Sequence, residues 1–296
     1  MLEYCRKNEI DLRADEPLSR HTTFKIGGPA DWFALPDTAE KLRGLLRFAA
    51  EREIKTAVLG RGSNLLAPDA GFRGLAVSTA ALCGCARTGE TGIEAGCGLL
   101  LSQLASFAAG CGLSGLEFAQ GIPGSLGGAV VMNAGAYGGE MSFVLLDSQV
   151  LTPAGEVRRF ALDEHRLGYR SSFFKENTGY VVLSSRLELH PGERGSIEAK
   201  MADFAARRRE KQPLQYPSAG SAYKRPPGHF AGQLIEQCGL KGFQIGGARV
   251  ADKHAGFIVN MGGATAEDVL RLMAHIERTV LAQTGVALER EIRILA

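Results

Sequence analysis

The stretch LEFAQGIPGSLGGAVVMNAGAYGGEM, residues 116–141, decides how the rest of the chain is organised. It holds seven glycines within nineteen residues, and no charged side chain occurs from Phe118 to Gly139. Because glycine loses much conformational entropy on folding, such density requires φ > 0 turns or a backbone that lies close to something flat or bulky. The glycines, with Pro123 and Asn133, disfavour a stable helix, and the apolar character disfavours a solvated linker. We interpret the stretch as buried loop backbone around a large planar ligand, with a tightly turned core loop as the alternative.

The composition around this stretch is that of a globular protein. The 296 residues allow one large or two ordinary domains, and 45% hydrophobic with 22% charged residues is close to average. A formal charge of +2, without a basic stripe, does not indicate nucleic-acid binding. The six cysteines include no CxxC pair, and the polar, charged residues 1–15 do not resemble a signal peptide. We therefore expect a cytoplasmic protein with reduced cysteines and no metal, the Cys83–Cys85 pair included.

The long apolar run from residue 95 to residue 139 contains Glu117 as its only charge. Glycines interrupt this run repeatedly, and its helical part, about residues 100–109, is far shorter than the ~20 residues that cross a bilayer. The sequence therefore predicts a core helix rather than a membrane span.

Hydrophobic periodicity predicts a mixed α/β protein. The predicted helices cover residues 38–51, 100–109, 196–212, 229–238 and 265–283. The predicted strands cover residues 32–35, 56–59, 74–78, 92–95, 143–151, 157–161, 180–189, 257–260 and 289–295, and residues 167–176 are expected to form a loop. Pro213 and Pro217 end the helix at 196–212 and mark the predicted domain boundary.

The segment GRGSNLLAP, residues 60–68, follows a predicted strand as a dinucleotide-binding loop does. The fingerprint fails because Leu65 stands where the third glycine belongs, and because Pro68 and Asp69 prevent a following helix. A GxxxxGK[ST] loop is absent as well. The backbone amides of this turn, with Ser63 and Asn64, suit an anion nest for a pyrophosphate, and an ordinary Gly-Ser-Asn turn is the alternative.

Seven motifs then occur in a fixed order along the chain. They are HTTFKIGG (21–28), GRGSN (60–64), GIPGSLGGAVVMNAGAYGGE (121–140), GYRSS (168–172), PSAGSAYKRP (217–226), KHAGFIVN (253–260) and LEREIRIL (288–295). Each motif alone is weak, but the ordered set resembles the UDP-N-acetylenolpyruvoylglucosamine reductase family from about residue 18 to the C-terminus. The segment that leads to Tyr169 contains no insertion. In this it resembles the shorter, second type of the family, which lacks an extra loop over the substrate.

The resemblance implies an FAD-binding α/β module of two subdomains, about 1–78 and 79–212, similar to vanillyl-alcohol-type oxidases. A smaller α/β substrate domain, 213–296, is implied to follow. The implied cofactor is non-covalent FAD, since the glycine-rich stretch has no His or Cys, and His21 and Cys97 are the two candidates for an exception. The implied FAD-binding residues are Gly60, Arg61, Gly62, Ser63, Asn64, Gly121, Ile122, Pro123, Gly124, Ser125, Gly127, Gly128, Asn133, Ala134 and Gly135.

The same resemblance implies a reaction and three catalytic residues. NADPH would reduce FAD, and the enolpyruvyl ether of UDP-N-acetylglucosamine would then be reduced to UDP-N-acetylmuramate for peptidoglycan synthesis. Arg170 would share the charge that develops on the substrate. Glu291, if protonated, would hydrogen-bond the developing enediolate. Ser221 would donate the proton to the substrate carbon, with Lys224 as the cation that assists a weakly acidic hydroxyl.

Five residues are implied to hold the anionic substrate: Tyr169, Lys224, Arg225, Lys253 and Arg293. His254 is a lesser candidate for the same task. Arg225 departs from the family pattern, because members often carry Asn in the corresponding FKNP motif. Neither a metal nor an obligate protein partner is implied.

The residues themselves leave simpler interpretations open. An Arg in a loop is usually solvated, a Ser between Gly and Ala is usually a turn residue, and Glu291 would ordinarily lie on the polar face of an edge strand. Two rival functions also remain: an FAD oxidase of the same fold that uses O₂, and a non-catalytic protein that binds a nucleotide sugar.

Overall fold

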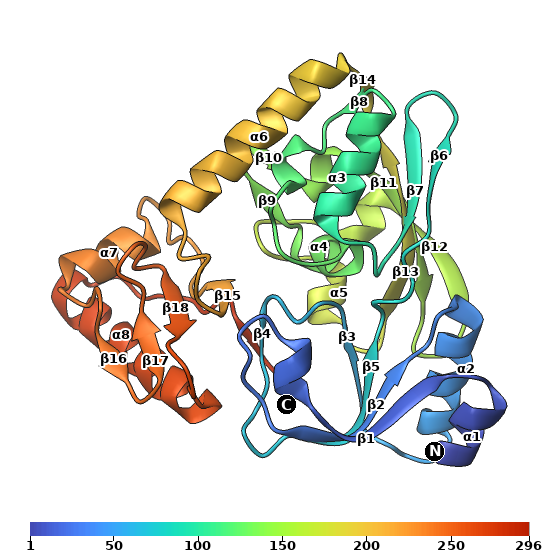
Figure 1. Ribbon diagram of the computed structural model, residues 1–296, viewed down its shortest axis with the longest axis horizontal. Helices are drawn as coiled ribbons and strands as arrows, with labels where there is room; N and C mark the ends of the chain where they lie inside the picture. The colour runs from blue at the N-terminus through green and yellow to red at the C-terminus, as the bar shows by residue number, and fades with distance from the viewer. Residues whose placement is uncertain (296) are drawn as a thin grey trace. The chain divides into compact units, whose positions relative to one another are not determined.

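The computed structural model describes residues 1–295, which form two compact units (Figure 1). Unit 1 contains Met1–Arg13, Trp32–Arg61 and Gly74–Arg208. Unit 2 contains Ala14–Asp31, Gly62–Arg73 and the chain from Arg209 onward. The predicted division at residue 212 lies close to the last of these changes, but two earlier segments also join the C-terminal part. The division into residues 1–212 and 213–296 stays a prediction.

Unit 1 is built on an antiparallel five-stranded sheet. Its strands lie in the order β12-β11-β13-β7-β6. They cover β6 (Cys85–Thr88), β7 (Gly92–Gly96), β11 (Leu145–Leu151), β12 (Val157–Ala161) and β13 (Val181–Glu188). The buried apolar residues of β13 continue one hydrophobic core with those of β7 and β11. The hairpin turn predicted at residues 153–155 joins β11 to β12. Gly155 has a φ of +79°, a positive value that glycine adopts readily in turns.

Helices cover this core. In α2 (Ala39–Ala50) the Thr38 hydroxyl accepts a hydrogen bond from the Lys41 amide, which caps the helix as predicted. In α3 (Leu101–Gly110) the buried side chains include Leu101, Leu104 and Ala108, so the expected core helix is confirmed. Figure 1 shows α3 and α4 (Leu126–Met132) beside the strands β7 and β13. No helix within residues 1–295 is long and apolar enough to cross a membrane.

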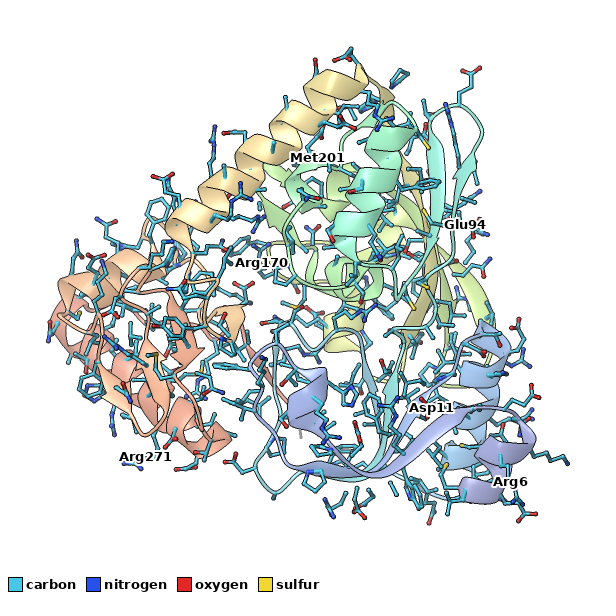
Figure 2. All side chains as sticks on the ribbon, in the orientation of Figure 1. Arg6, Asp11, Glu94, Arg170, Met201 and Arg271 are labelled. Atoms are coloured by element: carbon cyan, nitrogen blue, oxygen red, sulfur yellow. The ribbon has the colours of Figure 1, made fainter. Side chains whose placement is uncertain are left out.

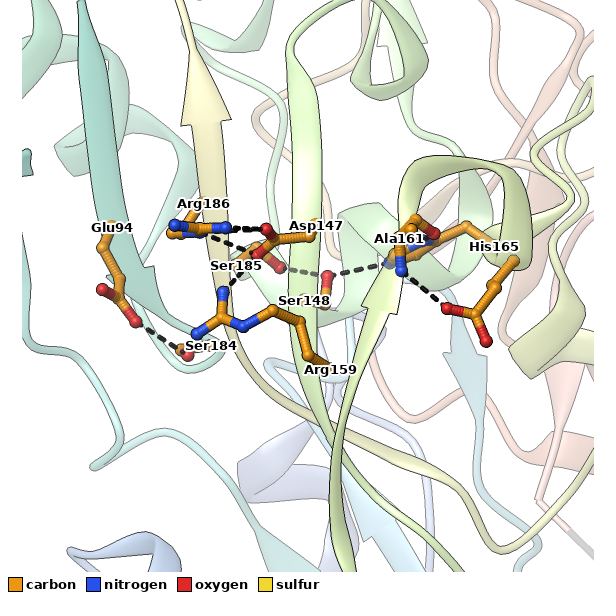
Figure 3. A network of polar contacts seen from close by, with 10 residues as sticks. Glu94, Asp147, Ser148, Arg159, Ala161, His165, Ser184, Ser185 and Arg186 are labelled. Atoms are coloured by element: carbon orange, nitrogen blue, oxygen red, sulfur yellow. Dashed lines mark hydrogen bonds and ion pairs between the residues drawn. The ribbon is translucent and has the colours of Figure 1, made fainter.

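A polar network crosses the five-stranded sheet (Figure 3). The Asp147 carboxylate accepts hydrogen bonds from Arg159 Nη1 at 2.6 Å and from Arg186 Nε at 3.0 Å. His165 is fully buried, and its two ring nitrogens lie 2.8 Å from Ala161 O and 2.9 Å from the Ser148 hydroxyl. Each of these buried polar groups therefore has a protein partner, as the fold requires.

Further elements belong wholly or partly to unit 1. A four-stranded sheet has the order β1-β2-β5-β3, and residues of its first three strands belong partly to each unit. These elements are α1 (Leu2–Lys7), β1 (Asp11–Pro17), β2 (Pro29–Leu35), β3 (Thr56–Leu59), β5 (Phe72–Ser78), β8 (Leu113–Ser114), η3 (Met141–Phe143), η4 (Leu162–His165), β14 (His190–Pro191) and α6 (Arg194–Lys211). The predicted helix at 196–212 is confirmed as α6, whose end precedes Pro213.

Unit 2 has its own antiparallel sheet and its own core. The strands β15 (Ser218–Ser221), β18 (Phe257–Asn260), β17 (Ala248–Val250) and β16 (Gln244–Ile245) are neighbours in that order. Two helices, α7 (Ala231–Gln237) and α8 (Ala266–Thr284), complete the layer. Thr265 and Asp268 form a capping box at the start of α8, and Gly285 ends it at φ +72°.

Segments distant in sequence complete unit 2. They include η1 (Leu18–His21) and β4 (Leu65–Leu66), and Phe24, Ile26 and Leu66 belong to the same apolar core as α8. The Asp69 carboxylate accepts hydrogen bonds from the Ala266 and Glu267 amides, at 2.7 and 3.1 Å. The Asn260 amide donates to Phe24 O at 3.1 Å. The C-terminal part therefore relies on residues 14–31 and 62–73 for its packing.

Candidate active site

The glycine-rich segment 116–141 contains a helix, so the prediction that it is loop throughout was wrong. Helix α4 (Leu126–Met132) includes both Gly127 and Gly128. A Cβ atom on Gly127 would lie 2.8 Å from Cys97 Cβ, and the Gly127 amide donates to Cys97 O at 2.8 Å. This glycine therefore allows the first helical turn to pack directly against the end of β7. The glycine density indicated a close approach correctly, and at Gly127 the close neighbour is Cys97.

Asn133 ends this helix and ties the following loop together. It adopts the left-handed conformation at φ +40° and is 1% exposed. Its carboxamide donates to Glu140 Oε1 at 3.1 Å and to Gly168 O at 3.2 Å, and it accepts from the Ser142 amide at 3.0 Å. These bonds hold the hairpin of β9 (Gly135–Ala136) and β10 (Gly139–Glu140) against the chain before Arg170. The expected role of Asn133 in FAD binding stays a prediction.

Two buried polar atoms on the same segment lack a protein partner. Within residues 1–295, three buried side-chain atoms have no hydrogen bond, and two of them are Gln120 Oε1 and Ser125 Oγ. Gln120 follows η2 (Glu117–Ala119), and Ser125 precedes α4. An unsatisfied buried polar group is costly, so each such group in a native fold requires an explanation. A ligand with polar atoms, such as FAD, fits here because it would give hydrogen-bond partners to the Gln120 side-chain carbonyl oxygen and the Ser125 hydroxyl.

The GRGSN turn meets this segment through its first glycine. A Cβ atom on Gly60 would lie 2.7 Å from Ser125 Oγ, so the Gly60 backbone and the unpartnered hydroxyl are neighbours within unit 1. Arg61 belongs to the same unit, as do all the predicted FAD residues between 121 and 135. Gly62, Ser63 and Asn64 belong to unit 2.

The backbone itself requires glycine at position 62, whether or not a phosphate binds nearby. Its φ is +61°, and a Cβ atom there would lie 2.2 Å from the carbonyl oxygen of His21. A side chain at this position would therefore break the turn even if no ligand bound nearby. Gly62 variants cannot report on FAD binding, whereas Ser125 variants can.

Arg170 lies at the tip of a tight turn beside the glycine-rich segment (labelled in Figure 2). Its Nη2 donates to Gly135 O at 3.0 Å, and its Nη1 donates to Asn133 O at 3.4 Å. The guanidinium also lies 5.3 Å from the ring centre of Tyr169, which is 54% exposed. The expected loop at 167–176 is wrong in one part, because Ser172 caps a short helix, α5 (Phe173–Glu176). Arg170 and the predicted FAD loop are therefore brought together in unit 1.

The segments that contain Ser221 and Glu291 pair with each other in unit 2. The Glu291 amide donates to Ala222 O at 2.9 Å, and the Lys224 amide donates to Glu289 O at 2.8 Å, so the two segments run antiparallel. The Asn64 carboxamide donates to Glu291 O at 3.0 Å. The C-terminal motif at 288–295 thus contacts both Asn64 and the motif at 217–226. The Lys224 ammonium forms an ion pair with Glu289 at 2.5 Å, and its predicted assistance to Ser221 stays a prediction.

The prediction of one continuous strand at 289–295 was wrong. The chain pairs with residues 222–224 up to Glu291, and then β19 (Arg293–Ile294) pairs in parallel with β4. The change of partner between Glu291 and Arg293 interrupts the ladder. This irregularity places Glu291 between Ala222 and Asn64.

The other predicted substrate residues lie in unit 2 on its surface. Arg225 stacks over the Phe230 ring at 3.7 Å, Lys253 Nζ donates to Arg209 O at 2.6 Å, and Arg293 is exposed in β19. His254 suits an anion poorly, because burial lowers its pKa and its Nδ1 accepts from the Gly256 amide at 3.0 Å. Their contacts with substrate stay predictions.

Arg208 was missed in the sequence analysis. It is 7% exposed, donates to Gln120 O at 3.2 Å and to Phe118 O at 3.4 Å, and lies 5.0 Å from the Tyr137 ring centre. Burial lowers its pKa, and no carboxylate within residues 1–295 pairs with it. A buried cation held only by carbonyls is a candidate for binding an anion. The run Arg207–Arg209 is visible in the sequence, but only the fold shows which of the three is buried.

Cys97, one of the two candidates for covalent attachment of FAD, is not suited to that task. Cys97 is 1% exposed, and burial raises its pKa to about 12, so its thiolate is not available. His21 Nε2 lies 2.9 Å from Glu16 Oε1. In the described part of the chain, no group of three or more His, Cys, Asp or Glu residues is arranged to hold a metal ion.

Comparisons with known proteins agree with this arrangement. Residues 30–161 match the FAD-binding domain, and residues 212–295 match the C-terminal domain of UDP-N-acetylenolpyruvoylglucosamine reductase. The fold and the site therefore define an FAD-binding α/β flavoprotein, as expected.

The relatives identify the family. The chain is 48% identical to UDP-N-acetylenolpyruvoylglucosamine reductase of Agathobacter rectalis, over 97% of this chain and 95% of the relative. It is 46% identical to the reductase of Syntrophomonas wolfei, over 96% and 95%. The crystal structure of the Thermus caldophilus reductase superimposes with a TM-score of 0.81 at 36% identity, covering 97% of this chain and 99% of that one. The chain belongs to the UDP-N-acetylenolpyruvoylglucosamine reductase family.

Proposed function

We propose that this protein is an FAD-dependent oxidoreductase that reduces the enolpyruvyl group of UDP-N-acetylglucosamine enolpyruvate with NADPH. The product is UDP-N-acetylmuramate, a peptidoglycan precursor. The observation that carries the proposal is the near-complete match to reductases of this name at 48% identity. The meeting of the Ser221 and Glu291 segments with Asn64, and of Arg170 with the FAD loop, supports it.

FAD, reduced by NADPH, supplies the hydride that the terminal enolpyruvyl carbon receives. The unpartnered Ser125 hydroxyl, the Gly60 backbone and the loop at 121–124 are the residues that would hold FAD. Its binding would be non-covalent, since burial keeps Cys97 protonated. Precipitation with acid should leave a colourless pellet and a yellow supernatant. A yellow pellet would show that the attachment is covalent.

Three side chains would act on the substrate. The Arg170 guanidinium, whose Nη atoms donate to two carbonyls, would stabilise the negative charge that develops on the substrate carboxylate. Glu291, if protonated, would donate a hydrogen bond from its carboxyl O–H to the same developing charge. Ser221 donates its hydroxyl proton to the carbon next to the carboxylate. Lys224, Arg225, Lys253, Tyr169 and Arg293 are proposed to hold the anionic sugar nucleotide.

Anaerobic spectroscopy tests the proposal as a whole. NADPH should bleach the flavin absorbance of the purified protein, and the enolpyruvyl substrate should then restore it. Rapid recolouring by O₂ without that substrate would favour the FAD oxidase instead. A protein that carries no flavin would favour a nucleotide-sugar-binding role.

Ser221→Ala tests the proton donor in the same experiment. Flavin reduction by NADPH should stay near the wild-type rate, while reoxidation by substrate should fall about 10³–10⁴-fold, in the upper range of general acid catalysis. Ser221→Cys should recover part of the rate because a thiol is more acidic. Equal slowing of both half-reactions by Ser221→Ala would assign Ser221 a binding role. The cytoplasmic location and the lack of an obligate protein partner stay predictions.

A further inference from the structure

The turn that carries Arg170 is unusual for its sequence. Gly168 and Ser171 exchange two backbone hydrogen bonds, at 3.0 and 3.1 Å, so Tyr169 and Arg170 are the two residues between them. Arg170 adopts φ +52°, the left-handed region that is disfavoured for a residue with a Cβ atom. Turns that require positive φ at this position usually place Gly or Asn there. An arginine in this conformation requires support from its surroundings.

Lys175 contacts the Arg170 backbone directly. Its ammonium donates to Arg170 O at 3.1 Å. The orientation of this carbonyl depends on the backbone angles of Arg170, so the bond favours the left-handed conformation. A backbone change at Arg170 would move the carbonyl away from Lys175 and redirect the guanidinium at the same time.

Lys175 is itself fixed by the elements around it. It lies in α5, whose capping residue Ser172 accepts from the Lys175 amide at 3.3 Å. The Ser172 hydroxyl donates to Val131 O in α4 at 2.6 Å and is fully buried. Helix α4 therefore anchors α5, and α5 presents Lys175 to the Arg170 carbonyl. The same helix ends at Asn133, whose carbonyl accepts from the Arg170 side chain.

We infer that Lys175 is a positioning residue for Arg170. It holds the strained backbone of Arg170 so that the guanidinium stays on the carbonyls of Asn133 and Gly135, in the orientation that the reaction uses. The inference rests on the proposed function, in which Arg170 stabilises charge on the substrate. Lys175 acts through Arg170 and makes no contact with substrate in this role.

The chain offers a matched control. Lys41 Nζ donates to Glu9 O at 3.0 Å, and Glu9 also has a positive φ, +51°. Lys41→Met therefore removes the same kind of bond from a residue in the same backbone conformation, at a place with no predicted site residue. Any general effect of losing a lysine–carbonyl bond should be similar in Lys41→Met and Lys175→Met.

The test measures both half-reactions by stopped flow with the FAD-loaded enzyme. Lys175→Met should slow flavin reoxidation by the enolpyruvyl substrate about 10- to 100-fold, since small misplacements of a reacting group have effects of that size. Reduction by NADPH and the KM for the sugar nucleotide should change less than about threefold, and Lys175→Arg should recover most of the rate because it keeps a donor. Lys41→Met should match the wild type in both half-reactions.

A double-mutant cycle separates positioning from direct action. If Lys175 acts only through Arg170, the Arg170→Ala/Lys175→Met double variant should reoxidise no more slowly than Arg170→Ala alone. A further tenfold loss in the double variant, or a raised KM with kcat retained in Lys175→Met, would overturn the inference. So would a folded Lys175→Arg that is as slow as Lys175→Met. If the wild type itself fails to reoxidise with the substrate, the proposed function fails instead.

Discussion

Unit 1 contains two groups of buried charge that are satisfied in different ways. On the five-stranded sheet, the Asp147 carboxylate is paired with Arg159 and Arg186, and charge neutralises charge. Beside the glycine-rich segment, the buried Arg208 donates to the carbonyls of Phe118 and Gln120. Carbonyls satisfy hydrogen-bond geometry but leave the net positive charge in place. The first group therefore has a structural role, and the second is suited to binding an anionic ligand.

Removing the carboxylate of the first group should have the largest effect on stability. Asp147→Ala deprives two arginines of their partner and should lower the unfolding free energy by about 1–3 kcal/mol, the range for hydrogen bonds to charged groups. Because both arginines are more than one third exposed, water limits the loss. Urea unfolding would measure it. A normal kcat for the folded, FAD-loaded variant is expected, and a large loss of kcat would contradict the structural role.

Arg208→Met should show the opposite pattern. The substitution removes a buried charge that lacks a carboxylate partner, so the unfolding free energy should change by less than about 1 kcal/mol, because relief of desolvation offsets the lost bonds. The rate of reoxidation by substrate should fall about tenfold, as for one lost charge-assisted hydrogen bond. Arg207→Met is the control, because Arg207 is exposed and pairs with Asp203 on the same helix. Wild-type turnover by Arg208→Met with a strongly reduced stability would invalidate the comparison.

Ser125→Ala extends the comparison between structural and ligand-binding polar groups to a group without charge. The hydroxyl has no protein partner, so its removal should leave the apoprotein as stable as the wild type or slightly more stable. If FAD is its partner, the Kd for FAD should rise by roughly tenfold or less, about 1 kcal/mol. Titration of the apoprotein with FAD and urea unfolding without FAD would measure the two effects. Ser63→Ala gives a parallel measurement on the predicted anion turn, and an unchanged Kd in Ser125→Ala would remove Ser125 from the site.

The pH dependence of stability tests the buried histidine beside the five-stranded sheet. Burial lowers the pKa of His165, although the carboxylates of Glu164, Asp147 and Asp163 act in the opposite direction. The unfolded chain therefore binds a proton below about pH 6.5, where the native protein does not yet bind one. The unfolding free energy should fall as the pH decreases from about 6.5 toward the lowered pKa, by at most ~1.4 kcal/mol per pH unit for each such histidine.

His254, whose pKa burial also lowers, adds to this slope with the same sign. Burial alone would raise the pKa of Asp147, but hydrogen bonds from Arg186 and Arg159 lower it, so its own contribution is lost only in more acidic solution. Urea unfolding between pH 7.5 and 5.5 would separate the two ranges. His165→Asn should reduce the slope in that interval. An unchanged slope would mean that His165 is protonated equally in both states.

Much of the fold could be predicted because local sequence patterns, such as hydrophobic periodicity and a helix cap, indicate its strands and helices. The strand at 56–59 and the strand at 257–260 have the predicted bounds, and α2 begins at the predicted cap. The helix in the glycine-rich segment could not be predicted, because its support is the contact of Gly127 with Cys97, thirty residues away. The broken last strand could not be predicted either, since the change of partner at Glu291 depends on residues 222–224 and 64–66.

For the site, the ordered motifs led to Arg170, Ser221 and Glu291 as residues of a known family. They gave no indication that Lys175 would bind the Arg170 carbonyl, because a lysine in a short polar segment is usually solvated. Nor did they distinguish Arg208 from its two arginine neighbours. Both assignments depend on which side chain is buried and on which carbonyl lies within reach.

The sequence by itself determined the class of fold, the family and the chemical types that the reaction needs. These properties follow from hydrophobic periodicity, from glycines where the backbone approaches a neighbour closely, and from motifs whose order is specific. The tertiary structure alone decided which charges are neutralised, as at Asp147, and which keep their charge on carbonyls, as at Arg208. The reason is physical: hydrogen bonding and desolvation act over a few ångströms in space, and residues that distance apart in the fold can be 90 positions apart in the chain, as Phe118 and Arg208 are.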